Sequence, residues 1–89
     1  MTEAPTDLPR YSKDYTPEQR NACVEWLSHL TLPDLRQRQS IMREQIERAY
    51  ALATKPVPPP WAHDTLEDLQ DKEQQLMDAV GRWLDRQTQ

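Results

Sequence analysis

Eight prolines and a single glycine divide this 89-residue chain into stretches that can and cannot form long helices. The prolines occupy positions 5, 9, 17, 33, 56, 58, 59 and 60, and the glycine is at position 81. A proline inside a helix removes a hydrogen bond and clashes with the preceding turn. Long helices are therefore predicted only in residues 34–54 and 64–87, which no proline interrupts. The scarcity of glycine also disfavours an all-β fold, because tight hairpin turns use it heavily.

Three helix starts can be read from capping residues and prolines. Thr16 and Gln19 can form a capping box around a proline that suits the first helical position. Pro33 either ends the segment before it or lies in the first turn of a second helix. Asp64 or Thr65 can cap the third helix, whose first turn is rich in acidic side chains that the helix dipole favours.

These signals give a segment map of the chain. Residues 1–15 show no period and are expected to be an irregular tail. A proline-rich linker should be stiff and extended. The remaining residues, 16–89, are expected to form one helical domain, with helices over about 17–29, 34–54 and 64–87 and the linker over 55–60.

Each expected helix carries one apolar stripe. The stripes comprise Cys23, Leu27 and Leu30; Leu35, Met42, Ile46, Ala49 and Ala53; and Leu66, Leu69, Leu76, Val80 and Trp83. Residues spaced three and four apart lie on one helix face, so each stripe can be buried by a neighbouring helix. Two long helices joined by a short linker favour an antiparallel hairpin. The predicted fold is all-α, with a short first helix packed on this hairpin to make a three-helix unit.

The narrow stripes predict a marginal core. Burying a large apolar side chain contributes ~1.5–3 kcal/mol, whereas ordering a residue costs ~1–2 kcal/mol of chain entropy. Small proteins with thin cores often gain stability from a partner or a second copy of themselves. The sequence therefore favours a non-enzymatic protein–protein interaction module (an adaptor, inhibitor or assembly subunit), whose partner is another protein or a second copy. Its expected partner-binding residues are the apolar Trp26, Met42, Ile46 and Trp83, with Arg36 and Arg43 attracting an acidic partner.

A basic second helix supplies the alternative function. Arg36, Arg38, Arg43 and Arg48 fall within residues 34–54, whereas residues 61–89 are predominantly acidic. These arginines could contact phosphates, which would make the protein a nucleic-acid-associated regulator. The formal net charge of −4 makes nucleic acid the less favoured partner. The acidic third helix is expected to neutralise the arginines in part.

Neither catalysis nor a bound cofactor is expected. The soft metal ligands are Cys23, His29 and His63, and their spacing does not match a zinc site, so no metal is predicted. Carboxylate pairs such as Glu67 and Asp71 are typical of a solvated helix face. No run of about 18 apolar residues predicts a membrane span. Without a basic region followed by an apolar one at the N-terminus, and with one cysteine, a cytoplasmic location is expected.

Several features leave two interpretations open. Gln39 and Glu73 interrupt the stripes, either as a buried pair that sets register or as stripe-edge residues that reach water. Gly81 weakens the third helix, so it could be kept for close packing. Residues 56–60 resemble a ligand of aromatic grooves, but they more simply space two helices. Trp61 is then expected to fold back onto the helix ends.

Overall fold

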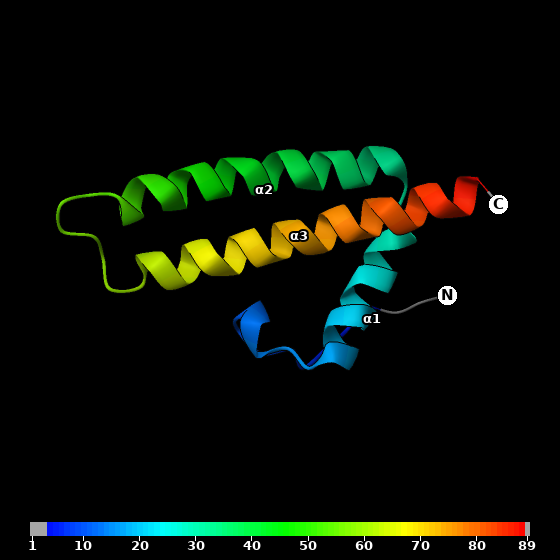
Figure 1. Ribbon diagram of the computed structural model, residues 1–89, viewed down its shortest axis with the longest axis horizontal. Helices are drawn as coiled ribbons and strands as arrows, with labels where there is room; N and C mark the ends of the chain where they lie inside the picture. Colours follow the sequence, from blue (N-terminus) through cyan, green and yellow to red (C-terminus); the bar gives the residue numbers. More distant parts are fainter. Residues whose placement is uncertain (1–3, 89) are drawn as a thin grey trace.

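The computed structural model describes residues 4–88, and every regular element in that range is helical. A 3-10 turn, η1 (Ser12–Asp14), precedes three α-helices: α1 (Pro17–Ser28), α2 (Leu32–Ala53) and α3 (Ala62–Gln87). α2 and α3 run antiparallel side by side, and α1 crosses α3 near its C-terminal half (Figure 1). The predicted all-α three-helix unit is therefore confirmed.

The chain begins its first two helices at capping threonines. The backbone N–H of Thr16 donates to Gln19 Oε1 at 2.9 Å, and Gln19 N–H donates to Thr16 Oγ1 at 3.1 Å, which confirms the capping box. The hydroxyl oxygen of Thr31 accepts from the Asp34 N–H at 3.3 Å. Pro33 consequently lies in the first turn of α2, where its missing N–H costs nothing.

The predicted cap of the third helix is wrong. α3 begins at Ala62, two residues before Asp64, and its N-cap Trp61 makes no side-chain capping bond. The backbone of Trp61 is already in the right-handed helical region, and the Ala62 N–H donates to the Pro59 carbonyl at 3.0 Å. The turn that follows the prolines thus leads directly into α3, and no polar side chain caps the first turn of the helix. Trp61 remains 50% exposed.

Part of the expected irregular tail is ordered against the helices. Ser12 in η1 is buried, and its N–H donates to Asp68 Oδ1 of α3 at 2.7 Å. Residues 4–11 form no regular element, as expected, and residues 1–3 of that expected tail lie outside the described residues. The N-terminal segment is thereby fixed to α3 just before α1 begins.

The core lies where α1 crosses the hairpin. Val24, Leu35, Leu76, Ala79 and Val80 are buried together, and Leu35 has no exposed surface. The partly buried residues packed around them are Leu27, Leu30, Leu32, Met42 and Trp83. Near the loop of the hairpin the buried apolar residues are alanines, at positions 49, 53 and 62. The predicted thin core is therefore found at one end of an elongated molecule that measures 50 × 26 × 16 Å.

Candidate functional site

An apolar cleft of about 450 Å³ opens where the three helices meet. Trp26 and Leu27 of α1, Met42 of α2 and Leu76 of α3 contribute to its lining, and Leu8 of the N-terminal segment lies along it. Apolar clefts with a few polar groups are typical sites for small ligands, and a groove of this kind can also take the apolar face of a partner helix. α1 lies steeply across α3 rather than along it (Figure 1).

Arg38 and Ile41 form the α2 side of the cleft. The Arg38 guanidinium carbon lies 5.5 Å from the centroid of the Trp26 ring, which is a cation–π distance. Ile41 is 48% exposed although it is large and apolar. Together with Trp26 they offer apolar contact area beside a positive charge, which suits a partner that presents an apolar side chain near a carboxylate.

The cysteine in the cleft is not activated. Burial raises the pKa of the Cys23 thiol, and only the charge of Lys72 opposes this shift. Burial likewise raises the pKa of Tyr15, which also lines the cleft. Because the thiolate is the reactive form of cysteine, Cys23 contributes apolar surface to the cleft.

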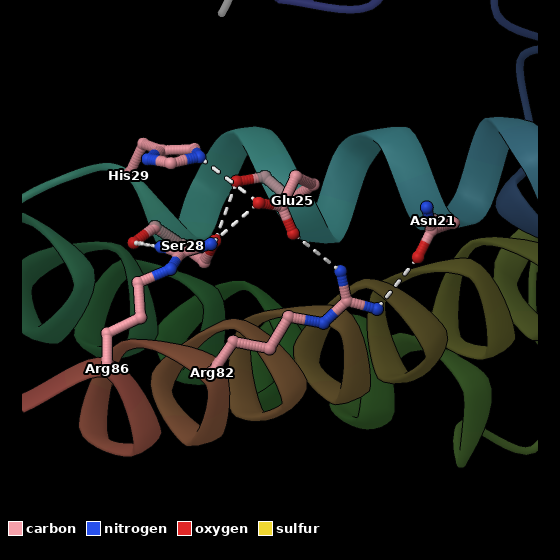
Figure 2. A network of polar contacts seen from close by, with 6 residues as sticks. All are labelled: Asn21, Glu25, Ser28, His29, Arg82 and Arg86. Atoms are coloured by element: carbon pink, nitrogen blue, oxygen red, sulfur yellow. Dashed lines mark hydrogen bonds and ion pairs between the residues drawn. The ribbon is translucent and has the colours of Figure 1, made fainter. Parts of the chain in front are cut away.

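Ion pairs to Glu25 fix α1 on α3. Arg82 Nη1 lies 2.9 Å from Glu25 Oε2, and Arg86 Nη2 lies 2.6 Å from Glu25 Oε1. The same arginines donate to Asn21 Oδ1 at 2.8 Å and to the Ser28 carbonyl at 2.9 Å (Figure 2). The hydrogen bond from Arg82 contributes most to lowering the pKa of Glu25. This network holds the wall of the cleft that carries Trp26.

A second ion pair joins the start of α1 to the middle of α3. Arg20 Nη1 donates to both carboxylate oxygens of Asp71, at 2.7 and 2.6 Å. The hydrogen bond from Arg20 is the main cause of the lowered pKa of Asp71. Sequence reasoning missed both sets of contacts, because partners more than fifty residues apart share no local spacing. The available signal was the i, i+4 spacing of Arg82 and Arg86, which places two arginines on one face of α3.

The expected neutralisation of the α2 arginines by α3 is wrong. Within residues 4–88, no ion pair involves Arg36, Arg38, Arg43 or Arg48. The acidic residues of α3 that form ion pairs, Asp68 and Asp71, contact Lys72 and α1 instead. The net charges of two helices do not reveal which of their faces meet. Because no carboxylate of residues 4–88 pairs with the α2 arginines, their charges are available for other contacts.

The six expected partner-binding residues do not form a single surface. Trp26 and Met42 line the cleft. Arg36 and Arg43 line a separate groove between α2 and α3. Ile46 is half-buried, and Trp83 packs against the core. Arg38 was expected only as a phosphate contact and Ile41 was given no binding role, although their three-residue spacing places both on one side of α2.

Gln39 and Glu73 are stripe-edge residues. Both are partly exposed and line the groove between α2 and α3. Gln39 Oε1 accepts a hydrogen bond from Arg36 Nη1 at 3.2 Å, and no hydrogen bond joins it to Glu73 among residues 4–88. The interpretation as a buried pair is therefore wrong, because the groove leaves both side chains accessible to water.

Two further properties apply to the described part of the chain. None of its helices combines the length and apolarity required to cross a membrane. Across residues 4–88, no three His, Cys, Asp or Glu side chains are grouped so that they could hold a metal ion.

Comparisons with known proteins give no relative. No family model matches the chain, and neither does a curated protein or a solved structure.

Proposed function

We propose that this protein is a non-enzymatic interaction module that binds another protein through the cleft between its three helices. The observation that carries the proposal is the grouping of Trp26, Ile41 and Met42 at the cleft beside Arg38. Buried aromatic and arginine side chains are typical anchors of protein interfaces. Adaptor, inhibitor and assembly-subunit roles all require such a surface.

The cleft suits an amphipathic, acidic segment of a partner. Apolar side chains of a helix can enter a groove of this kind, with the helix axis following it. Arg38 has no carboxylate within ion-pairing distance among residues 4–88, so it can pair with an Asp or Glu of the partner. Apolar insertion would supply affinity, and the ion pair would orient the partner.

Affinity capture with matched variants tests this function. The tagged full chain would be used as bait in an extract of its native cell, beside I41E, R38E and V57E variants. Ile41 and Arg38 are exposed, so the folded state should survive, and circular dichroism would check it. Val57 is 88% exposed in the distant loop and serves as the control. We expect one reproducible partner with wild type and V57E, and its loss with I41E and R38E; equal recovery by all four baits would contradict the proposal.

The unpaired α2 arginines keep nucleic acid as a second candidate. Four guanidinium groups along one helix can contact phosphates, and each contact adds to the salt dependence of binding. A fluorescence anisotropy titration with duplex DNA and single-stranded RNA at several salt concentrations tests this function. Binding that weakens steeply with salt and is lost in R36E/R43E would support it. Absence of binding at low salt would remove it.

A further inference from the structure

The N-terminal segment lies along the apolar cleft although it belongs to none of the three helices. Ala4, Pro5 and Leu8 line the cleft together with residues of α1, α2 and α3. Pro5 and Leu8 are half-buried, whereas Asp7 is exposed. A segment of the chain itself therefore covers part of the apolar surface that the proposed function assigns to a partner.

A single backbone hydrogen bond anchors this segment to the helices. The Ser12 N–H donates to Asp68 Oδ1 at 2.7 Å, which holds η1 against α3. Within residues 4–88, no hydrogen bond or ion pair involves residues 4–10. The part of the segment that lies on the cleft is thus held by its apolar surface and by the anchor that follows it.

The backbone of the segment adopts an unfavourable conformation at Asp7. Its φ of 57° lies in the left-handed region, which residues other than glycine rarely adopt, although aspartate tolerates it better than most. Release of the segment from the cleft would let Asp7 return to an ordinary conformation. The absence of polar bonds and the backbone cost both make the segment easy to displace.

We propose that residues 4–9 form an autoinhibitory strap, which covers the cleft until a partner displaces it. This inference rests on the proposed function, since a partner must enter the cleft. The strap carries the chemistry that the cleft favours in a partner, because the apolar Pro5 and Leu8 flank the carboxylate of Asp7. An internal competitor lowers the apparent affinity for a partner in proportion to the fraction of molecules whose cleft is open.

Cys23 provides a readout of the strap that needs no partner. It is the single cysteine of the chain, it is half-buried, and it lines the cleft together with Leu8. A thiol reagent should reach Cys23 more easily when the strap leaves the cleft. The rate of modification therefore reports how often the cleft is uncovered.

Modification of Cys23 by iodoacetamide in the full chain tests the strap. L8S removes the apolar side chain of the strap without placing a charge near the thiol, so modification should be about fivefold faster than in wild type. V57S is the matched control, because Val57 is exposed in the distant loop and does not line the cleft. It should react at the wild-type rate.

Stability measurements separate release of the strap from unfolding. Leu8 lies outside every helix, so L8S should keep the circular dichroism spectrum and the urea midpoint of wild type. Equal modification rates in L8S and wild type would overturn the strap. A faster rate in L8S that is matched by an equal loss of global stability would overturn it as well, because Cys23 would then react through unfolding.

Two substitutions at Ser12 test the anchor. S12P removes the N–H that bonds to Asp68, and the extended backbone of Tyr11 is compatible with a following proline. S12A keeps the N–H, and it removes a buried hydroxyl that has no hydrogen-bond partner among residues 4–88. We expect faster modification of Cys23 in S12P and the wild-type rate in S12A. The wild-type rate in S12P would overturn the anchored strap.

Affinity capture then tests the autoinhibitory role. With limiting amounts of bait, L8S should recover more of the partner than wild type, and L8S/I41E should recover none. Faster modification of Cys23 together with equal capture by L8S and wild type would overturn autoinhibition. Failure of every bait to capture a partner would contradict the proposed function, whereas the modification rates decide separately whether the strap covers the cleft.

Discussion

At the scale of single residues, the surroundings of Gly81 and Leu35 in the fold decide what each residue contributes to stability. Gly81 lies inside α3, where a glycine costs helix stability, and the sequence suggested close packing as the reason. A Cβ placed on Gly81 would meet no atom within 4 Å outside its own local backbone, so the close-packing interpretation is wrong. Leu35, by contrast, has a packing role that its position does not reveal. It is completely buried, although its place in the apolar stripe of residues 34–54 is no different from that of the other members.

Substitution G81A should stabilise the protein. Alanine restricts the unfolded chain and favours the helix, so we expect the free energy of unfolding to rise by ~0.5–1 kcal/mol. Urea denaturation followed by circular dichroism measures this change. Ala51, exposed on α2, provides the control: A51G should lower the free energy of unfolding by a similar amount. A loss of stability in G81A would show that the site needs glycine.

At the scale of elements, α1 depends on contacts that its own sequence does not supply. A helix of 12 residues is marginal in isolation. Its capping box could be read from sequence, but its attachment to α3 comes from the buried Val24 and from the ion pairs of Arg20 with Asp71 and of Glu25 with Arg82 and Arg86. Since α1 carries Trp26, these ion pairs position the candidate binding site as well as the helix.

The docking of α1 should depend on pH. Arg82 chiefly lowers the pKa of Glu25, and Arg20 chiefly lowers that of Asp71. A pKa lower in the folded state than in the unfolded state, where it is near ~4, stabilises the fold above that pH, and the stabilisation is lost as pH falls through the folded value. We expect a constant urea midpoint from about pH 7 to 5 and a decrease below about pH 4.

The variant E25Q/D71N checks the cause of this pH dependence. It should be less stable than wild type at neutral pH by on the order of 1 kcal/mol, because the ion pairs are partly exposed. The difference should shrink at low pH, where the wild-type carboxylates are protonated as well. A difference that stays constant with pH would show that the variant acts through packing rather than charge.

At the scale of the whole molecule, the two ends of the hairpin are built differently. The end beneath α1 buries Val24, Leu35, Leu76 and Val80, whereas the loop end buries Ala49, Ala53 and Ala62. Alanine lets two helices approach closely but removes little apolar area from water. The elongated shape follows from this arrangement, because α1 covers the hairpin over only part of its length (Figure 1).

The loop end should therefore open more readily than the covered end. In hydrogen–deuterium exchange, backbone amides of residues 46–53 and 62–68 should exchange faster than those of residues 74–82. Local opening is easiest where few large apolar side chains are buried. Mass spectrometry of peptic fragments measures the difference. Equal protection along α3 would show that the hairpin opens as one unit.

The sequence by itself determined the helices, the proline-rich reversal, the capping box of the first helix and the thinness of the core. These follow from local rules: proline and glycine placement, capping spacing and apolar period act between near neighbours. Only the tertiary structure decided which faces meet. It paired Glu25 with Arg82, joined Trp26 and Met42 in one cleft and left Arg36 and Arg43 on another surface. The rotation of each helix about its axis depends on packing against distant residues, and no local spacing records it.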